Sequence, residues 1–217
     1  IGTGNVKSGV ITASFGTSGT LYGVSDAPAV DDNGEVAAFC DSTDKWLPLV
    51  CTMNVTVVTE QVRDLFGLSL EDMESAVSSV DPGSGGLTFL PYLNGERTPN
   101  LPNGKGVIHG LTTNNMRPEY LIRSAMEGAT MGLAYGMRKF NEMGVSPSEI
   151  RVTGGGSQSQ SWRQISADVF NASVVPLATS EGASLGAAIQ AMHCISESED
   201  NNYESLCERF VKIDDAG

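Results

Sequence analysis

The order of strand-like and helix-like segments changes along this chain, and that change limits the folds it can adopt. The N-terminal part holds short strand-like runs separated by turns, at residues 10–15, 20–24, 36–40 and 46–52. In the last third, strand-like runs alternate with helical patterns, at residues 150–153, 162–170, 174–177 and 183–195. Runs joined by short turns predict antiparallel strands, whereas strands separated by helices predict parallel strands with crossover connections. The sequence therefore predicts one α/β domain with a mixed sheet flanked by helices.

The middle of the chain adds a long helix with an unusual composition. Helical spacing runs from Pro118 to Met143, and proline suits the first turn of a helix. Three glycines share one face of it: Gly128, Gly132 and Gly136. Each glycine would cost about 1 kcal/mol relative to alanine in an exposed helix. We therefore expect another backbone to pack closely against this face.

Charge and composition exclude several classes of partner. Lys and Arg number 13 against 26 Asp and Glu, which gives a net charge of −13 at pH 7. Attraction to phosphate backbones or anionic lipids cannot drive binding with that balance, so we expect neither nucleic acid nor membrane as a partner. The first nine residues lack a signal-peptide pattern, and the four cysteines form no Cys-x-x-Cys pair. These features predict a cytoplasmic protein with reduced thiols.

Common catalytic and phosphate-binding motifs are missing from the sequence. Residues 104–106 lack the spacing of a Walker A loop, and residues 154–159 lack the third glycine of the dinucleotide fingerprint. The two histidines, His109 and His193, have no nucleophile or ligand at a suitable spacing, so we expect no metal site. Asp32 and Asn33 lie in a segment typical of a hairpin turn rather than of a catalytic base.

Two loops that combine glycine with hydroxyl residues remain as candidates for binding. Residues 16–20 read Gly-Thr-Ser-Gly-Thr between two strands, so backbone N–H groups and hydroxyls could surround an anion. Residues 154–157 read Gly-Gly-Gly-Ser between a strand and a helix, where a ligand could approach the backbone near a helix N-terminus. Each loop taken alone could equally be an ordinary turn.

Taken in order, the motifs of this chain resemble the C-terminal half of FGGY carbohydrate kinases, from Ile1 to about Ile195. The resemblance is carried by residues 14–19, 89–99, 106–111, 127–128, 154–157 and 181–188. One departure is Tyr120, which stands where the second family signature usually has His, Asp, Glu, Asn or Gln. The segment Gly-Glu-Arg-Thr-Pro, residues 95–99, is more similar to xylulokinases than to glycerol kinases.

The resemblance implies a ribonuclease-H-like domain of the actin and hexokinase superfamily that spans residues 1–217 and binds ATP with Mg²⁺. The implied contacts to the ATP phosphates are Gly16, Thr17, Ser18, Gly19 and Gly86. The implied adenosine-binding residues are Gly154, Gly155, Gly156, Ser157 and Gln160. The implied reaction is ATP-dependent phosphorylation of a sugar, first of all D-xylulose to D-xylulose 5-phosphate.

The same resemblance places the rest of the catalytic machinery outside this chain. The family's base is an Asp in a Gly-Asp-Asn type of motif, expected just upstream of Ile1, and the sugar-binding residues lie mainly in an N-terminal domain that is absent from the chain. We therefore expect the chain to need its own N-terminal domain as a partner and to be inactive alone. Whether it forms a homodimer stays open. Glu96 and Arg97 either face the cleft between domains or brace the long loop by a salt bridge.

Other functions remain open at this point. The acceptor could be another pentulose, a hexulose or a polyol. A noncatalytic nucleotide-binding module of the same superfamily would retain both loops and lack the base. A purely structural α/β domain with two incidental turns would bind no ATP.

Overall fold

The computed structural model describes residues 1–179, 181–196 and 199–214 of the chain. The strands are β1 (Val10–Phe15), β2 (Gly19–Gly23), β3 (Ala37–Cys40), β4 (Trp46–Thr52), β5 (Thr88–Leu90), β6 (Val107–His109), β7 (Glu149–Thr153) and β8 (Ser173–Pro176). The α-helices are α1 (Thr56–Phe66), α2 (Leu70–Ser78), α3 (Pro118–Glu142), α4 (Gln160–Phe170), α5 (Gly182–Ile195) and α6 (Tyr203–Phe210). The short 3₁₀ segments are η1 (Ser84–Gly86), η2 (Gly155–Gln158) and η3 (Glu199–Asn201).

The predicted mixed sheet is confirmed. Its strand order is β3-β4-β2-β1-β7-β8, and β5 and β6 form a separate two-stranded ribbon. The first four strands pair antiparallel, whereas β1, β7 and β8 run parallel to one another. β1 therefore lies between the antiparallel and the parallel parts of the sheet. This arrangement brings the end of β1 beside the end of β7, although the two strands lie far apart in the sequence.

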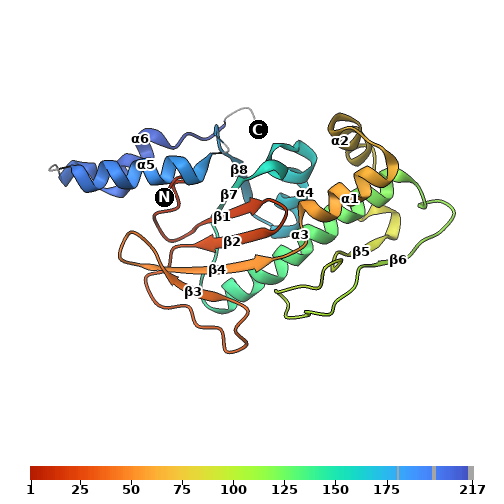
Figure 1. Cartoon of the computed structure of the whole chain (residues 1–217), viewed down its shortest axis with the longest axis horizontal. Helices are drawn as coiled ribbons and strands as arrows, with labels where there is room; N and C mark the ends of the chain where they lie inside the picture. Colours follow the sequence, from red (N-terminus) through yellow and green to blue (C-terminus); the bar gives the residue numbers. More distant parts are fainter. Residues whose placement is uncertain (180, 197–198, 215–217) are drawn as a thin grey trace.

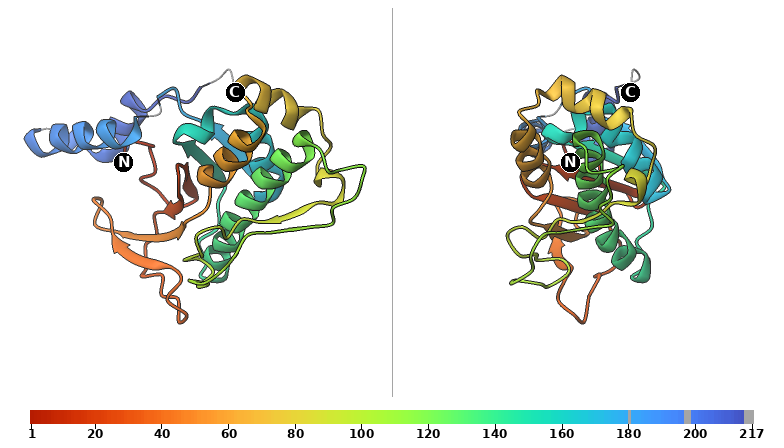
Figure 2. Two further views of the ribbon diagram at one scale, coloured as in Figure 1. Left: turned by 45° about the vertical axis from the view of Figure 1, so that its right-hand side comes forward. Right: turned by 90° about the vertical axis from the view of Figure 1, so that its right-hand side faces the viewer.

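The two faces of the sheet have different chemistry. Along β1, the alternating residues Ile11, Ala13 and Phe15 join a hydrophobic core that α1, α3 and α4 also enter. Thr12 and Ser14 point to the opposite face, as the alternation of side chains in a strand requires. Figure 1 shows α5 and α6 projecting beyond the sheet, and Figure 2 shows the same separation from a second direction. A cavity lies between this polar face and the start of α5, with Ser14 and Gly182 among its lining residues.

The helix α2 is an element that the sequence analysis does not predict. Ser69 caps it by accepting a hydrogen bond from the N–H of Asp72, and the Asp72 side chain accepts one from the N–H of Ser69 in return. This reciprocal pattern is a capping box, and Met73 and Val77 on the following turns are buried. The spacing of Ser69, Asp72 and the two apolar residues was the available signal in the sequence.

Two expectations about glycines and turns need correction. Close packing along α3 holds at Gly128 and Gly136, where an added Cβ would lie 2.1 Å from the Phe89 carbonyl oxygen and 2.5 Å from a Val50 methyl group. At Gly132 an added Cβ would meet nothing within 4 Å, so packing explains only part of the stripe. The turn at residues 31–34 exists, but β2 and β3 do not pair, because β4 lies between them in the sheet.

Two further sequence expectations concern membranes and thiols. None of the helices formed by the described residues is long and apolar enough to cross a membrane. All four cysteines lie in the described part of the chain, and each is a free thiol.

Candidate functional site

Two cavities of similar size lie on either side of the contact between β1 and the loop that follows β7. The glycine-bend cavity has a volume of about 530 Å³ and is lined by Phe15, Gly16, Thr56, Thr59, Glu60, Leu70, Glu71, Met73, Glu74, Gly155, Gly156, Gln158, Ser159, Gln160 and Trp162. The strand-face cavity has a volume of about 520 Å³ and is lined by Ile1, Gly2, Thr3, Ser14, Thr20, Tyr22, Thr153, Gly154, Gly182, Ala183, Gly186, Ala187 and Gln190.

A short wall of backbone separates these cavities. Ser14 and Gly154 line the strand-face cavity, whereas Gly16 and Gly155 line the glycine-bend cavity. Gly154 has a φ of +87°, and an added Cβ would lie 2.6 Å from the carbonyl oxygen of Phe15. Only glycine fits that close approach without strain. The wall is therefore built from two backbone segments in direct contact.

Gly155 has the opposite environment. It opens η2 without a positive φ, and an added Cβ would meet nothing within 4 Å. Ser157 stabilises the bend behind it, because both its N–H and its hydroxyl donate to the Gly154 carbonyl oxygen, at 3.1 and 2.7 Å. The bend thus presents bare backbone to the cavity from a braced position.

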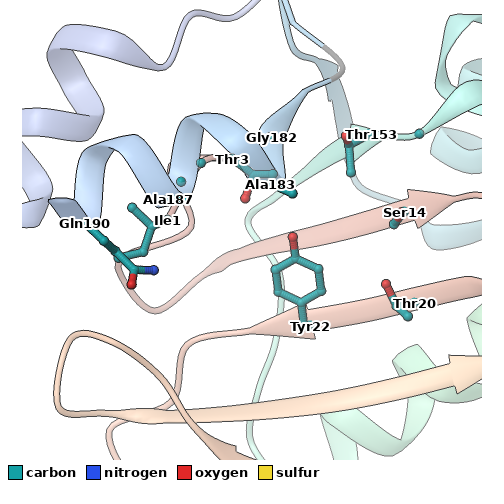
Figure 3. A pocket seen from close by; sticks show the side chains of 13 residues that line it. Ile1, Thr3, Ser14, Thr20, Tyr22, Thr153, Gly182, Ala183, Ala187 and Gln190 are labelled. Carbon is teal, nitrogen blue, oxygen red and sulfur yellow. The ribbon is translucent and has the colours of Figure 1, made fainter.

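The strand-face cavity is lined mainly by hydroxyl groups and glycines. Figure 3 shows Thr20 and Tyr22 on β2 pointing their oxygens toward the start of α5, where Gly182 and Ala183 lie. Thr153, at the end of β7, lines the same cavity from the neighbouring strand. The cavity can therefore offer several neutral hydrogen-bonding groups to a polar ligand.

The turn between β1 and β2 is attached to the N-terminal end of α1. The N–H of Thr56 donates to the Gly16 carbonyl oxygen at 3.0 Å, and the N–H of Val55 donates to the Thr17 carbonyl oxygen at 3.2 Å. The helix has no side-chain cap and no acidic residue in its first turn. The carbonyl groups of the turn therefore serve as the partners that a helix N-terminus requires.

A wall of the glycine-bend cavity depends on Glu74, which the sequence analysis did not identify. Its carboxylate accepts hydrogen bonds from the Ser159 hydroxyl at 2.6 Å and from the Ser161 N–H at 2.7 Å. Burial opposes ionisation of this carboxyl, but the hydrogen bonds from Ser159 and Ser161 outweigh it and hold the pKa of Glu74 below its ordinary value. Glu74 thus joins α2 to the N-terminus of α4 and fixes the width of the cavity between them.

Beneath the bend lies the indole of Trp162. Its Nε1–H donates to the Thr130 hydroxyl at 2.9 Å, and its ring packs against Phe15 with ring centroids 5.3 Å apart. An added Cβ at Gly156 would lie 3.1 Å from the indole ring. The aromatic pair therefore supports the bend from the core side.

Only some of the residues expected to bind the nucleotide line the same cavity. Gly16, Gly155, Gly156 and Gln160 line one cavity together. Thr17 and Ser18 form the exposed tip of the β1–β2 turn.

Two other residues expected to contact the phosphates, Gly19 and Gly86, also line neither cavity. Gly19 is buried, and an added Cβ there would lie 2.6 Å from a Val55 methyl group. Gly86 ends η1, lines neither cavity, and has its carbonyl oxygen against Gly110. Close packing thus accounts for glycine at position 19.

The side chains of Glu96 and Arg97 lie in different environments. Glu96 is only 3% exposed, and its carboxylate accepts hydrogen bonds from the N–H of Met53 at 2.6 Å and of Arg97 at 2.7 Å. The side-chain amide of Asn54 donates to its other oxygen at 3.0 Å. Arg97 has an exposed side chain. Glu96 therefore braces the loop through N–H donors of the segment before α1.

Among residues 1–179, 181–196 and 199–214, no group of three or more His, Cys, Asp and Glu side chains is placed to hold a metal ion. The polar side chains that line the two cavities are hydroxyl groups, the amides of Gln158, Gln160 and Gln190, and the acids of α1 and α2.

Comparison with known proteins identifies the family. The profile of the FGGY family of carbohydrate kinases, C-terminal domain, matches residues 11–195. The chain belongs to this family. The chain is 45% identical to a xylulose kinase of Haemophilus influenzae, and the match covers 99% of this chain and 43% of that protein. It is 31% identical to a gluconokinase of Bacillus subtilis, with 89% of this chain and 40% of that protein covered.

A solved structure supports the same assignment of this FGGY-family chain. The xylulose kinase of Bifidobacterium adolescentis superposes with a TM-score of 0.82 and is 30% identical, covering 98% of this chain and 41% of that one. The resemblance to FGGY kinases and the ribonuclease-H-like fold expected from the sequence are thereby confirmed. The chain spans less than half the length of these relatives.

Proposed function

We propose that the complete protein transfers a phosphoryl group from ATP to a sugar, and that this chain supplies the nucleotide-binding half. The observation that carries the proposal is the lining of the glycine-bend cavity, which Gly16, directly after β1, shares with Gly155 and Gly156, which follow β7. Two glycine segments from distant parts of the sequence thus border one space. Family membership supports a kinase over a structural domain.

The geometry favours a defined direction for the nucleotide. Adenosine would lie in the glycine-bend cavity, against the bare backbone at Gly155 and the start of α4 at Gln160. The phosphates would pass the β1–β2 turn toward the strand-face cavity, whose hydroxyl groups suit a polar ligand. We propose Thr17 and Ser18, at the exposed tip of that turn, as phosphate contacts. None of Thr17, Ser18, Gly19 and Gly86 lines either cavity, but Gly19 is buried and the Gly86 carbonyl oxygen lies against Gly110.

The chain's own residues would act by binding and positioning. Little covalent chemistry is required of the protein in phosphoryl transfer, because catalysis comes mainly from alignment and stabilisation of charge. Mg²⁺ would enter with the nucleotide and neutralise charge on its phosphates. A base must take the proton of the attacking hydroxyl, and we place that base in an Asp upstream of Ile1. The N-terminal domain that contains it would also bind the sugar.

D-Xylulose is the first candidate for the acceptor. The relative with 45% identity is a xylulose kinase, and the solved structure with 30% identity is another. Gluconate is the second candidate, because a gluconokinase is 31% identical over most of this chain. Another pentulose, hexulose or polyol remains a further alternative within the family.

The proposal is tested with both the chain and the complete protein. The isolated chain should bind Mg-ATP weakly in calorimetry and transfer no phosphate to any sugar. The complete protein should phosphorylate D-xylulose faster than gluconate or glycerol in a coupled ADP-release assay. Absence of ATP binding by both forms would contradict the proposal, and ATP binding without transfer would indicate a noncatalytic module.

We place the reaction in the cytoplasm, in keeping with the four free thiols.

A further inference from the structure

We infer that Glu96 is a positioning residue that orients the β1–β2 turn toward the phosphates of the nucleotide. This inference rests on the function proposed above. Glu96 lines neither cavity and lies on a loop distant in sequence from the turn, so it acts through the segment before α1.

The first step is the direction of the N–H groups in the turn. The Gly16 and Thr17 carbonyl oxygens accept hydrogen bonds from the first N–H groups of α1. In a trans peptide the carbonyl and the N–H of the same unit point in opposite directions. The N–H of Thr17 therefore points away from α1, and so does the N–H of Ser18. Both residues are exposed.

Neighbouring N–H groups that point the same way form a concave site for anions. Within the described part of the chain, neither the Thr17 N–H nor the Ser18 N–H has a backbone acceptor. The hydrogen bonds from the start of α1 to the Gly16 and Thr17 carbonyl oxygens therefore set the direction of the Thr17 and Ser18 N–H groups. A displacement of the start of α1 would turn both donors away from a bound phosphate.

Glu96 fixes the start of α1. Its two carboxylate oxygens accept from the Met53 N–H at 2.6 Å and from the Asn54 side-chain amide at 3.0 Å. Asn54 is 1% exposed, directly precedes Val55, and also donates to the Gly95 carbonyl oxygen at 2.6 Å. Since an ionised carboxylate only accepts hydrogen bonds, it matches these N–H donors. A glutamine at position 96 would place an NH₂ group against one of them.

The test separates phosphate binding from adenosine binding. Calorimetry with ATP and with adenosine is carried out on the chain and on its Glu96→Gln variant. We expect the Kd for ATP to rise about tenfold, equal to about 1.4 kcal/mol, while the Kd for adenosine changes by less than about twofold. Loss of a negative charge would by itself favour an anionic ligand. Weaker ATP binding therefore cannot come from the charge change.

Glu35→Gln is the matched control. Glu35 is a second carboxylate that braces the same loop, with 9% of its side chain exposed. It accepts a hydrogen bond from the Asn100 N–H at 3.1 Å and pairs with Lys139 of α3 at 3.1 Å. Its side-chain partners in the described part of the chain are Asn100, Tyr135 and Lys139, none of which belongs to α1. This variant loses the same charge, and we expect its melting temperature to fall without a change in the ratio of the ATP and adenosine Kd values.

The possible results are distinct. A Glu96→Gln variant that weakens ATP and adenosine by the same factor, or that leaves both unchanged, would overturn the positioning role. An equal change of the ratio in Glu35→Gln would also overturn it. Wild-type chain that binds neither compound would instead refute the proposed function. Should Glu96→Gln fail to fold, Asn54→Ser removes the amide donor to Glu96 and is expected to show the same selective loss.

Discussion

A substitution at Gly155 tests whether the glycine bend borders the nucleotide. The structure places nothing within 4 Å of an added Cβ at this position, and its φ is not positive. Replacement of a glycine by alanine at a compatible φ stabilises a protein by about 0.4–1 kcal/mol. Gly155→Ala should therefore fold at least as well as the wild type. Gly155→Val adds two further carbons to the same wall and should narrow the cavity enough to exclude adenosine.

The expected size of the effect follows from ligand linkage. ATP at about 100 times its Kd stabilises the folded state by about 2.7 kcal/mol. For a domain of this size each kcal/mol shifts the melting temperature by about 2–4 °C. Differential scanning fluorimetry should thus show a rise of about 5–11 °C with the wild type. Gly155→Val should show no rise, with a melting temperature in the absence of ATP within about 2 °C of the wild type.

Gly154→Ala is the control for damage to the fold. Its φ of +87° and the approach of an added Cβ to within 2.6 Å of the Phe15 carbonyl oxygen predict a lower melting temperature without any ligand. Loss of ATP binding in Gly155→Val with normal stability supports the bend as the adenosine wall. Unchanged ATP affinity in Gly155→Val would refute that reasoning.

Three other predictions concern stability and association. Because the pKa of Glu74 is lowered from its ordinary value of 4.5, its stabilising hydrogen bonds are fully present above that pH and lost as the pH falls through the lowered pKa. The difference in melting temperature between wild type and Glu74→Gln should therefore shrink below about pH 4.5 in acid titrations; a constant difference would contradict this. Gly128→Ala should lower the free energy of unfolding by about 1–3 kcal/mol, whereas Gly132→Ala should raise it, both measured by urea unfolding. Equal effects of the two substitutions would show that backbone packing does not distinguish these positions. The isolated chain should self-associate through apolar residues such as Ile195, which is 82% exposed, and a monomer at all concentrations in sedimentation velocity would argue against this.

Local patterns predicted most elements of this fold because they report local backbone preferences. The strand-like run at residues 10–15 predicted β1 as the structure has it, and the helical spacing from Pro118 to Met143 predicted α3, which the structure ends one residue earlier, at Glu142. The helix α2 was not predicted, because only its capping box and two buried residues indicate it in the sequence. The two glycine-hydroxyl loops were also recognisable from their composition, although among their glycines only Gly154 has a positive φ, which favours glycine.

The sequence by itself determined the alternation of strands and helices, the glycine bend at 154–156 and the membership of the family. Tertiary structure decided which of these segments meet. The strand order places β1 beside β7, so Gly16 and Gly155 share a cavity while Gly86 lies outside it. It also buries Glu96 against the start of α1. These contacts join residues far apart in the chain, and their position depends on how the whole core packs, which no local pattern records.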